Sequence, residues 1–151
     1  MTKTPEQLTA SMHHSIPILA RMQVRVLEAG PGHATIELPA APNVNHFGAM
    51  YAGSLYTAAE VLGGVIPRAS FDLDGELAGF VPLLKSSEIR YLKPALGAVR
   101  ARARFADGDL ERLPREALAR GKVEFVLEAE ILDVDGIVLA TSRNVYQLRR
   151  L

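Results

Sequence analysis

Apolar and polar residues alternate in several stretches of the chain, and this alternation predicts β-strands. Residues 22–28 and 34–38 alternate on either side of a Gly/Pro-rich turn at residues 29–32, which predicts a hairpin. The later runs with strand patterns are residues 77–92, 99–106, 122–132 and 137–148. The Asp135–Gly136 pair between the last two runs is a strong hairpin signal. We expect the long run at residues 77–92 to be interrupted near Pro82, because proline cannot donate to a strand ladder.

Apolar residues recur at helical intervals in two other stretches. Residues 51–66 predict a mostly buried helix, which we expect Pro67 to end. Residues 5–20 predict a short amphipathic helix that Pro17 would end or kink. A further short helix is expected around residues 114–120.

The resulting order is β-β-α-β-β-β-β, with one central helix followed by a run of strands. Segregated helices and strands indicate the α+β class, not a doubly wound parallel sheet. A sheet of about six antiparallel strands must bury one face, and one helix of about four turns can cover that face if the sheet wraps around it. This is the geometry called hotdog. Because no repeat or linker divides the chain, we expect one hotdog domain over residues 1–151, with residues 1–20 as an N-terminal segment or short helix.

Composition and charge narrow the classes of function. The chain has 151 residues, 48% of them hydrophobic, and 17 basic residues balance 17 acidic ones. The lack of a basic surplus argues against a nucleic-acid or anionic-membrane partner. The absence of cysteine excludes disulfides, thiolate metal sites and a cysteine nucleophile. No apolar run reaches signal-peptide or membrane-span length, so a soluble cytoplasmic protein is the default expectation.

The stretch from residue 45 to residue 60 contains the residues that suggest chemistry. A loop with Asn45, His46 and Gly48 leads directly into the central helix, whose first turn contains Gly53. A helix N-terminus presents free N–H groups, and small residues there let a substrate carbonyl approach closely. Glu60 lies two turns further along a helix that is otherwise almost entirely apolar. A carboxylate in such a place is costly unless it is paired or protonated, which makes it a functional candidate rather than a solvated surface residue.

This stretch resembles the loop-and-helix signature of hotdog thioesterases of the phenylacetate-pathway type. The matching residues read Asn45-x-x-Gly48-x-x-Tyr51-Ala52-Gly53-x-x-Tyr56-x-x-Ala59-Glu60. A second match, Ile89-x-Tyr91-Leu92-x-Pro94-Ala95, resembles the strand that ends in Pro-Ala in the same family. The subgroup it is most similar to is the thioesterase-like domain found at the C-terminus of some acetyltransferase fusions. The resemblance covers about residues 20–149.

The resemblance implies hydrolysis of an acyl thioester of coenzyme A or a related pantetheine carrier, without a cofactor or a metal. Glu60 would be the catalytic carboxylate, as nucleophile or as general base on water. The Gly53 amide would polarise the thioester carbonyl, and Asn45 would position the water or the carboxylate. The residues expected to bind the substrate are His46, Gly48, Tyr51, Ala52 and Ser86.

The resemblance also implies a homodimer, or a dimer of such dimers, with the active site between subunits and with Glu60 and Asn45 supplied by different chains. Two other functions stay open. The interval of fourteen residues between His46 and Glu60 resembles that of hydroxyacyl-thioester dehydratases, although no proline separates the two residues here. A non-catalytic module that binds acyl thioesters is the other alternative.

Overall fold

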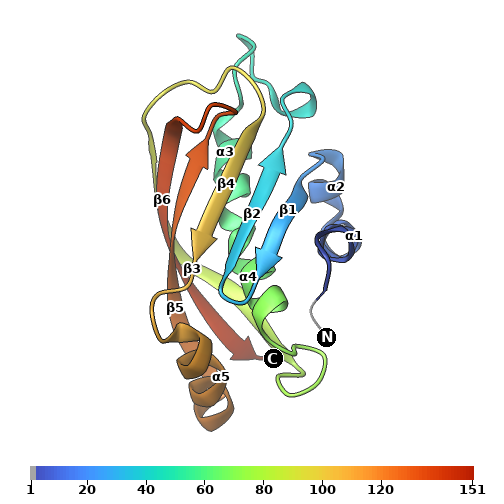
Figure 1. The fold of residues 1–151 in the computed structure, drawn as a ribbon, viewed down its shortest axis with the longest axis vertical. Helices are drawn as coiled ribbons and strands as arrows, with labels where there is room; N and C mark the ends of the chain where they lie inside the picture. Colours follow the sequence, from blue (N-terminus) through green and yellow to red (C-terminus); the bar gives the residue numbers. More distant parts are fainter. Residues whose placement is uncertain (1–2) are drawn as a thin grey trace.

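Six antiparallel strands form one curved sheet in the order β1-β2-β4-β5-β6-β3. This computed structural model describes residues 3–151. The strands are β1 (Arg25–Gly30), β2 (His33–Leu38), β3 (Phe80–Tyr91), β4 (Val99–Arg104), β5 (Lys122–Leu132) and β6 (Val138–Arg150). The sheet curves around the central helical segment, which lies behind it in Figure 1. The predicted α+β class and hotdog arrangement are therefore confirmed.

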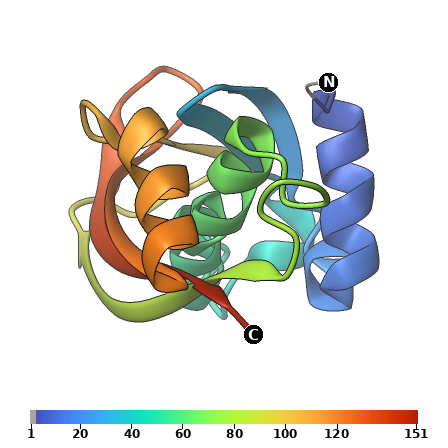
Figure 2. The same ribbon diagram turned by 90° about the horizontal axis from the view of Figure 1, so that it is seen from below.

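The helices pack on the concave side of the sheet and at its ends. They are α1 (Pro5–Ser15), α2 (Pro17–Arg21), α3 (Ala52–Glu60), α4 (Leu62–Ser70) and α5 (Asp109–Arg120), with a short 3-10 turn, η1 (Ala41–Asn43). As predicted, the N-terminal helix breaks at Pro17, which begins α2. Figure 2 shows α1 at the edge of the molecule, beside the central helical segment. None of these helices, within residues 3–151, is long and apolar enough to cross a membrane.

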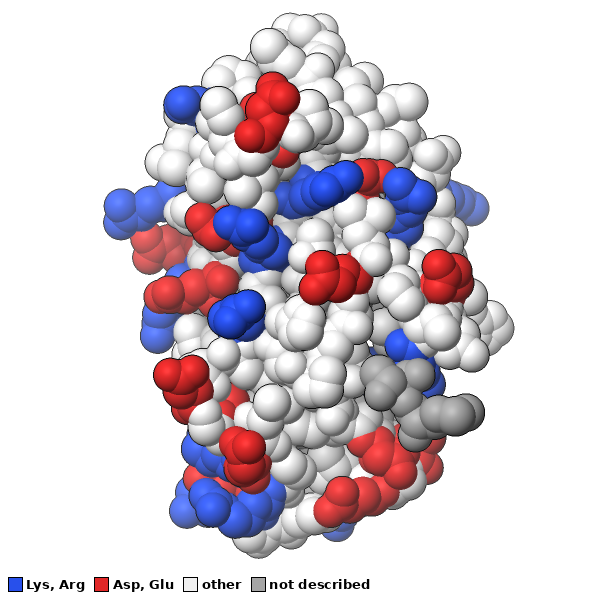
Figure 3. Space-filling view, viewed as in Figure 1, with Lys and Arg blue, Asp and Glu red and all other residues white. Residues whose placement is uncertain are grey.

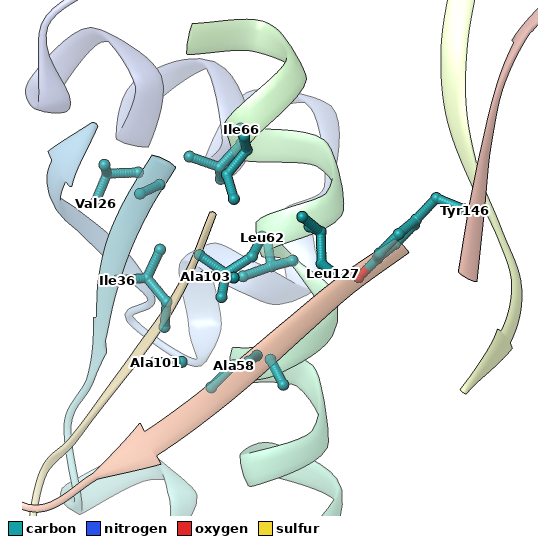
Figure 4. Packing of buried hydrophobic residues seen from close by; sticks show 14 of the residues in the cluster. Val26, Ile36, Ala58, Leu62, Ile66, Ala101, Ala103, Leu127 and Tyr146 are labelled. Atoms are coloured by element: carbon teal, nitrogen blue, oxygen red, sulfur yellow. The ribbon is translucent and has the colours of Figure 1, made fainter. Parts of the chain in front are cut away.

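Strand alternation directs apolar side chains to the helices and charged side chains to solvent. Along β4, Val99, Ala101 and Ala103 are buried, while the arginines between them are exposed. Figure 4 shows Ala58, Leu62 and Ile66 of α3 and α4 among these strand residues. Small alanines on the sheet let the helical segment approach closely, which gives the dense packing that a core requires.

The outer face of the sheet has charges of both signs, which Figure 3 shows interspersed over the strands. Arg102 lies 3.1 Å from Glu130, and Arg100 lies 3.7 Å from Glu37. These cross-strand pairs explain the alternating arginines of β4 as part of a solvated face.

The central helical segment is not the single continuous helix that the sequence predicts. It breaks at Val61 into α3 and α4. In a continuous helix the Gly64 amide would bond to the Glu60 carbonyl, but it bonds instead to the Val61 carbonyl at 3.0 Å. The Glu60 carbonyl accepts a hydrogen bond from the Tyr146 hydroxyl of β6 at 2.7 Å. The break is therefore held by a side chain from the last strand.

Gly63 makes room for that side chain. A Cβ atom added at Gly63 would lie 2.0 Å from a ring carbon of Tyr146, whereas one added at the adjacent Gly64 would meet no atom within 4 Å. The two neighbouring glycines thus have different roles. Gly63 is required by packing, and Gly64 faces open space.

Two predictions based on proline are wrong, because the helix and the strand both continue through the proline. Pro67 lies inside α4 and does not end it, and the helix continues to Ser70 because proline removes only one backbone donor. β3 runs through Pro82, which an edge strand tolerates. The irregularity in β3 is a bulge at Lys85. α5 also begins five residues earlier than predicted, at Asp109.

Substitution of the two adjacent glycines by alanine should change stability in opposite directions. Gly63→Ala forces a methyl group into the Tyr146 ring and should lower the free energy of unfolding by about 2 kcal/mol or more. Gly64→Ala adds a better helix former in open space and should raise it by about 0.5–1 kcal/mol. Denaturant unfolding of both variants measures the difference. Equal effects at the two positions would contradict the packing role of Gly63.

Candidate active site

Glu60 is the last residue of α3 and lines a cavity of about 330 Å³. The cavity lies between α1, the beginning of α4, β3 and β6, and most of its walls are apolar. No hydrogen-bond or ion-pair partner for the Glu60 carboxylate is found within residues 3–151, and burial raises the pKa of this carboxyl group above its ordinary value. An unpaired, half-buried carboxylate is disfavoured in its charged form, so it is a stronger base than an exposed glutamate.

The N-terminus of α3 leaves backbone donors free. The amides of Ser54 and Leu55 bond to the Tyr51 carbonyl, and no side chain caps the helix. Within the described part of the chain, the amides of Ala52 and Gly53 have no acceptor. Gly53 and Glu60 are seven residues apart, so they lie on the same side of α3, about 10 Å apart along its axis. One face of α3 therefore has amide donors at its beginning and a carboxylate at its end.

Asn45 organises the loop that precedes α3. Its side-chain oxygen accepts hydrogen bonds from the amides of Phe47 and Ala49 at 3.0 and 3.1 Å. Its backbone amide bonds to the Ala49 carbonyl at 2.7 Å, which closes a tight turn. The oxygen is thus occupied by the loop, and the side-chain NH₂ group remains as the donor. Asn45 does not line the cavity that contains Glu60.

The residues expected to bind substrate lie around this loop and the beginning of α3. His46 is exposed and its ring contacts Phe47 edge-on, with ring centroids 4.9 Å apart. Gly48 has a positive φ of 84°, which the turn requires. The Tyr51 ring lies against Gly53, because a Cβ at Gly53 would be 2.5 Å from a Tyr51 ring carbon. None of these residues lines the Glu60 cavity.

A hydrogen bond joins the first turn of α3 to β3. The Ala52 carbonyl accepts a hydrogen bond from the Tyr91 hydroxyl at 2.9 Å, which fixes the end of β3 to the helix. Burial, and then the proximity of Tyr51 and Tyr56, raises the pKa of Tyr91. The two sequence motifs that resemble the thioesterase pattern are therefore in direct contact.

The structure does not direct Ser86 toward the helix. Ser86 is opposite Val145 of β6, on the outer face of the sheet, because the bulge at Lys85 shifts the alternation of β3. Its neighbour Ser87 is opposite Asn144 and donates a hydrogen bond to the Asn144 side-chain oxygen. Ser87 is therefore the serine of β3 that faces the helical side.

Sequence reasoning missed a series of hydrogen bonds between polar side chains that begins at Ser87. The Asn144 side-chain amide donates to the Tyr146 hydroxyl at 3.0 Å, and that hydroxyl donates to the Glu60 carbonyl. Both residues are on the inward side of β6, where Asn144 is completely buried. Polar residues at inward positions of an alternating strand are the signal that could have identified them. In residues 3–151 no three acidic or histidine side chains gather as metal ligands.

Comparison with known proteins now identifies the family. The sequence profile of the family described as "Putative thioesterase (yiiD_Cterm)" matches residues 5–146. The chain belongs to this family. Among solved structures, this thioesterase-family chain is similar to PA5026 from Pseudomonas aeruginosa, named as a probable thioesterase of unknown function. The identity is 36%, the likeness covers 100% of this chain and 99% of that one, and the TM-score is 0.86.

A second structure extends the likeness. The thioesterase-like protein from Shewanella oneidensis is 27% identical, with 96% of each chain covered and a TM-score of 0.81. The thioesterase HI1161 from Haemophilus influenzae shares the fold at 17% identity and a TM-score of 0.75. No match was found among proteins of curated function. The family and the first two of these structures support thioesterase activity in general.

The raised pKa of Glu60 predicts how stability depends on pH. The folded state binds the proton of Glu60 more tightly than the unfolded chain does, so this group favours folding below its ordinary pKa. That contribution is lost as pH rises through the higher folded-state pKa. The variant Glu60→Gln should therefore have a higher melting temperature than the wild type at about pH 8, and the difference should shrink toward about pH 4. Thermal unfolding across this range measures it. A difference independent of pH would contradict the assignment.

Proposed function

We propose that this protein is a thioesterase that hydrolyses an acyl thioester of coenzyme A or a related pantetheine carrier. One observation carries the proposal: the Glu60 carboxylate is unpaired and half-buried in the wall of an apolar cavity. An apolar cavity suits an acyl group, and a carboxylate with a raised pKa suits proton transfer near neutral pH. Membership of the thioesterase family supports the same reaction.

In the proposed reaction, the Glu60 carboxylate accepts a proton from water as the water oxygen attacks the thioester carbonyl carbon. The carbonyl oxygen gains negative charge, and in the proposed dimer the free amide of Gly53 of the partner subunit stabilises it as an oxyanion donor. The C–S bond then breaks, and the proton held by Glu60 passes to the departing sulfur. The products are a carboxylic acid and a free thiol. The same geometry also serves direct attack by Glu60, which gives an anhydride that water cleaves.

The alternative of a hydroxyacyl-thioester dehydratase has less support. The matching family and the similar structure PA5026 are named for thioester hydrolysis, and the prolines that those dehydratases have between histidine and acid are lacking between His46 and Glu60. A module that only binds acyl thioesters has no use for an unpaired carboxylate, whose burial costs stability.

The proposed active form is a homodimer, in which loop residues of one chain approach Glu60 of the other. This proposal is supported by the position and exposure of β3. This strand is at the edge of the sheet, is twelve residues long, and is exposed from Leu83 to Glu88. A long exposed edge strand requires a partner or protection. Antiparallel pairing of β3 with its copy would extend the sheet across a twofold axis.

An apolar patch continues from this edge over the loops next to α3. Its members are exposed aromatic and aliphatic residues: Val44, Phe47, Tyr51, Tyr91, Leu92 and Leu96. The upper end of the molecule in Figure 3 is nearly free of charged side chains. Exposed apolar patches of this kind mark protein contacts. The patch includes the loop of Asn45, so the same interface would bring that loop to the partner's helix.

Removal of the carboxylate should abolish most of the activity. Glu60→Gln should lower kcat for hydrolysis of an acyl-coenzyme A by about a hundredfold or more, the usual scale for a general base. In the wild type, kcat/KM should rise with pH through a pKa above that of an ordinary glutamate, because only the ionised form accepts the proton. Thiol release with a colorimetric reagent measures both.

The matched control is Glu111→Gln, which changes an exposed glutamate of α5 in the same way. It should leave kcat unchanged. Turnover of Glu60→Gln equal to that of the wild type would refute the catalytic role of Glu60. Formation of an enoyl product from a 3-hydroxyacyl-coenzyme A, without thiol release, would favour the dehydratase.

The dimer is tested at the edge strand. Leu83→Lys places a charge on β3 and should shift sedimentation from dimer toward monomer, because edge lysines oppose strand pairing. Leu118→Lys changes a similarly exposed leucine on α5 and should leave the dimer intact. A monomeric wild type in analytical ultracentrifugation would overturn the proposal. A tetramer that Leu83→Lys converts to dimers would indicate a dimer of dimers.

A further inference from the structure

The cavity that contains Glu60 is bounded by the N-terminal helix. Its walls include Leu8 and Met12 of α1, Val65 of α4, and Pro82 of β3. Two hydrogen bonds hold α1 in place, one to β1 and one to Val24, the residue before β1. The Val26 amide donates to the Thr9 hydroxyl at 2.9 Å, and His13 Nε2 lies 2.6 Å from the Val24 carbonyl oxygen. The lining residues of the central segment run from Glu60 to Arg68. The cavity therefore extends along α4, away from the N-terminus of α3.

We infer that this cavity holds the acyl chain of the substrate, that it suits a chain of about ten to twelve carbons, and that Gly64, because it has no side chain, keeps the cavity open to this length. The inference rests on the proposed function, because it takes Glu60 as the group that acts on the thioester. It adds the class of substrate and a residue that determines specificity.

The volume of the cavity and its length along the helix each give an estimate of the length of the acyl chain. An apolar cavity of about 150 Å³ accommodates the six carbons of benzene, so about 330 Å³ holds roughly twice as many, about twelve. The eight-residue interval from Glu60 to Arg68 corresponds to about 12 Å of helix. An extended chain advances about 1.2 Å per bond, so about ten bonds span this interval. Both estimates indicate a medium-length acyl group.

The polarity of the lining favours an acyl chain over the pantetheine arm. Pantetheine has two amide groups, which need hydrogen-bond partners when they are buried. Two polar groups of the lining are already engaged: the Tyr146 hydroxyl with the Glu60 carbonyl, and Arg68 with Asp74 at 3.7 Å. Apart from the hydroxyls of Ser11 and Ser15 and the Glu60 carboxylate, the remaining lining residues are apolar or glycine. Methylene groups bind well against such walls, with a gain of roughly fourfold in affinity for each one buried.

Gly64 is the position where a side chain would block the cavity without disturbing the core. It lines the cavity and is exposed, and a Cβ added there meets no atom within 4 Å. The adjacent Gly63 cannot serve this purpose, since a side chain there would displace Tyr146. A leucine at position 64 would extend from α4 into the space that the distal carbons of the acyl chain occupy.

The test compares acyl-coenzyme A substrates from four to sixteen carbons with the wild type, Gly64→Leu and Ala119→Leu, using thiol release. Ala119 is an exposed residue of α5, so Ala119→Leu adds a leucine to a helix remote from the cavity. We expect the wild type to have its highest kcat/KM at about ten to twelve carbons. Gly64→Leu should lower the ratio of kcat/KM for decanoyl- over butyryl-coenzyme A by at least tenfold, and Ala119→Leu should not change this ratio.

The other outcomes separate the inference from the proposed function. Hydrolysis whose chain-length profile is the same in the wild type and Gly64→Leu would overturn the inference and leave the thioesterase proposal standing. If no substrate is hydrolysed, the thioesterase proposal fails, and calorimetric binding of S-decyl-coenzyme A, a thioether that cannot be hydrolysed, tests the cavity by itself. Binding at least tenfold weaker in Gly64→Leu than in the wild type supports the inference. Equal binding, or none, overturns it.

Discussion

The hydrogen bond from the Tyr146 hydroxyl to the Glu60 carbonyl determines the shape of the central helical segment. A buried carbonyl without a partner costs about 1–3 kcal/mol, so the helix can break at this point only if another donor replaces the lost amide. Tyr146 supplies that donor from the last strand, and Gly63 leaves space for its ring. The break makes Glu60 the final residue of α3, beside the cavity and not inside a continuous helix. The position of the carboxylate therefore depends on a contact between residues far apart in the sequence.

The strands could be predicted because their signal is local. Alternation along β4 and β5 reports directly which side chains face the core, and turn residues such as Gly136 mark where the strands end. The break at Val61 could not be predicted in this way. Helical periodicity continues across residues 55–66, and the donor that stabilises the break comes from Tyr146. Proline also does not reliably mark the end of a helix, since Pro67 lies inside α4.

The part of the candidate site that lies on a single helix, α3, could be predicted from the sequence. The spacing of Gly53 and Glu60 places both on one face of α3, and the structure agrees with this geometry. The one-residue bulge at Lys85 turns the Ser86 side chain to the outer face of the sheet, opposite to what regular alternation predicts. No local sequence pattern reveals such a bulge. The cavity could not be predicted at all, because its walls come from α1, α4, β3 and β6, which only the fold brings together.

α1 forms one wall of the cavity but is not part of the sheet. The side chains of Thr9 and His13 attach it to β1 and to Val24, the residue before β1, and it takes no part in the strand pairing of the sheet. Mutations on its inner surface can therefore widen or narrow the cavity while every strand pairing and the position of the carboxylate stay the same. In the proposed thioesterase, substitutions in α1 alone would then change which acyl groups the cavity accepts.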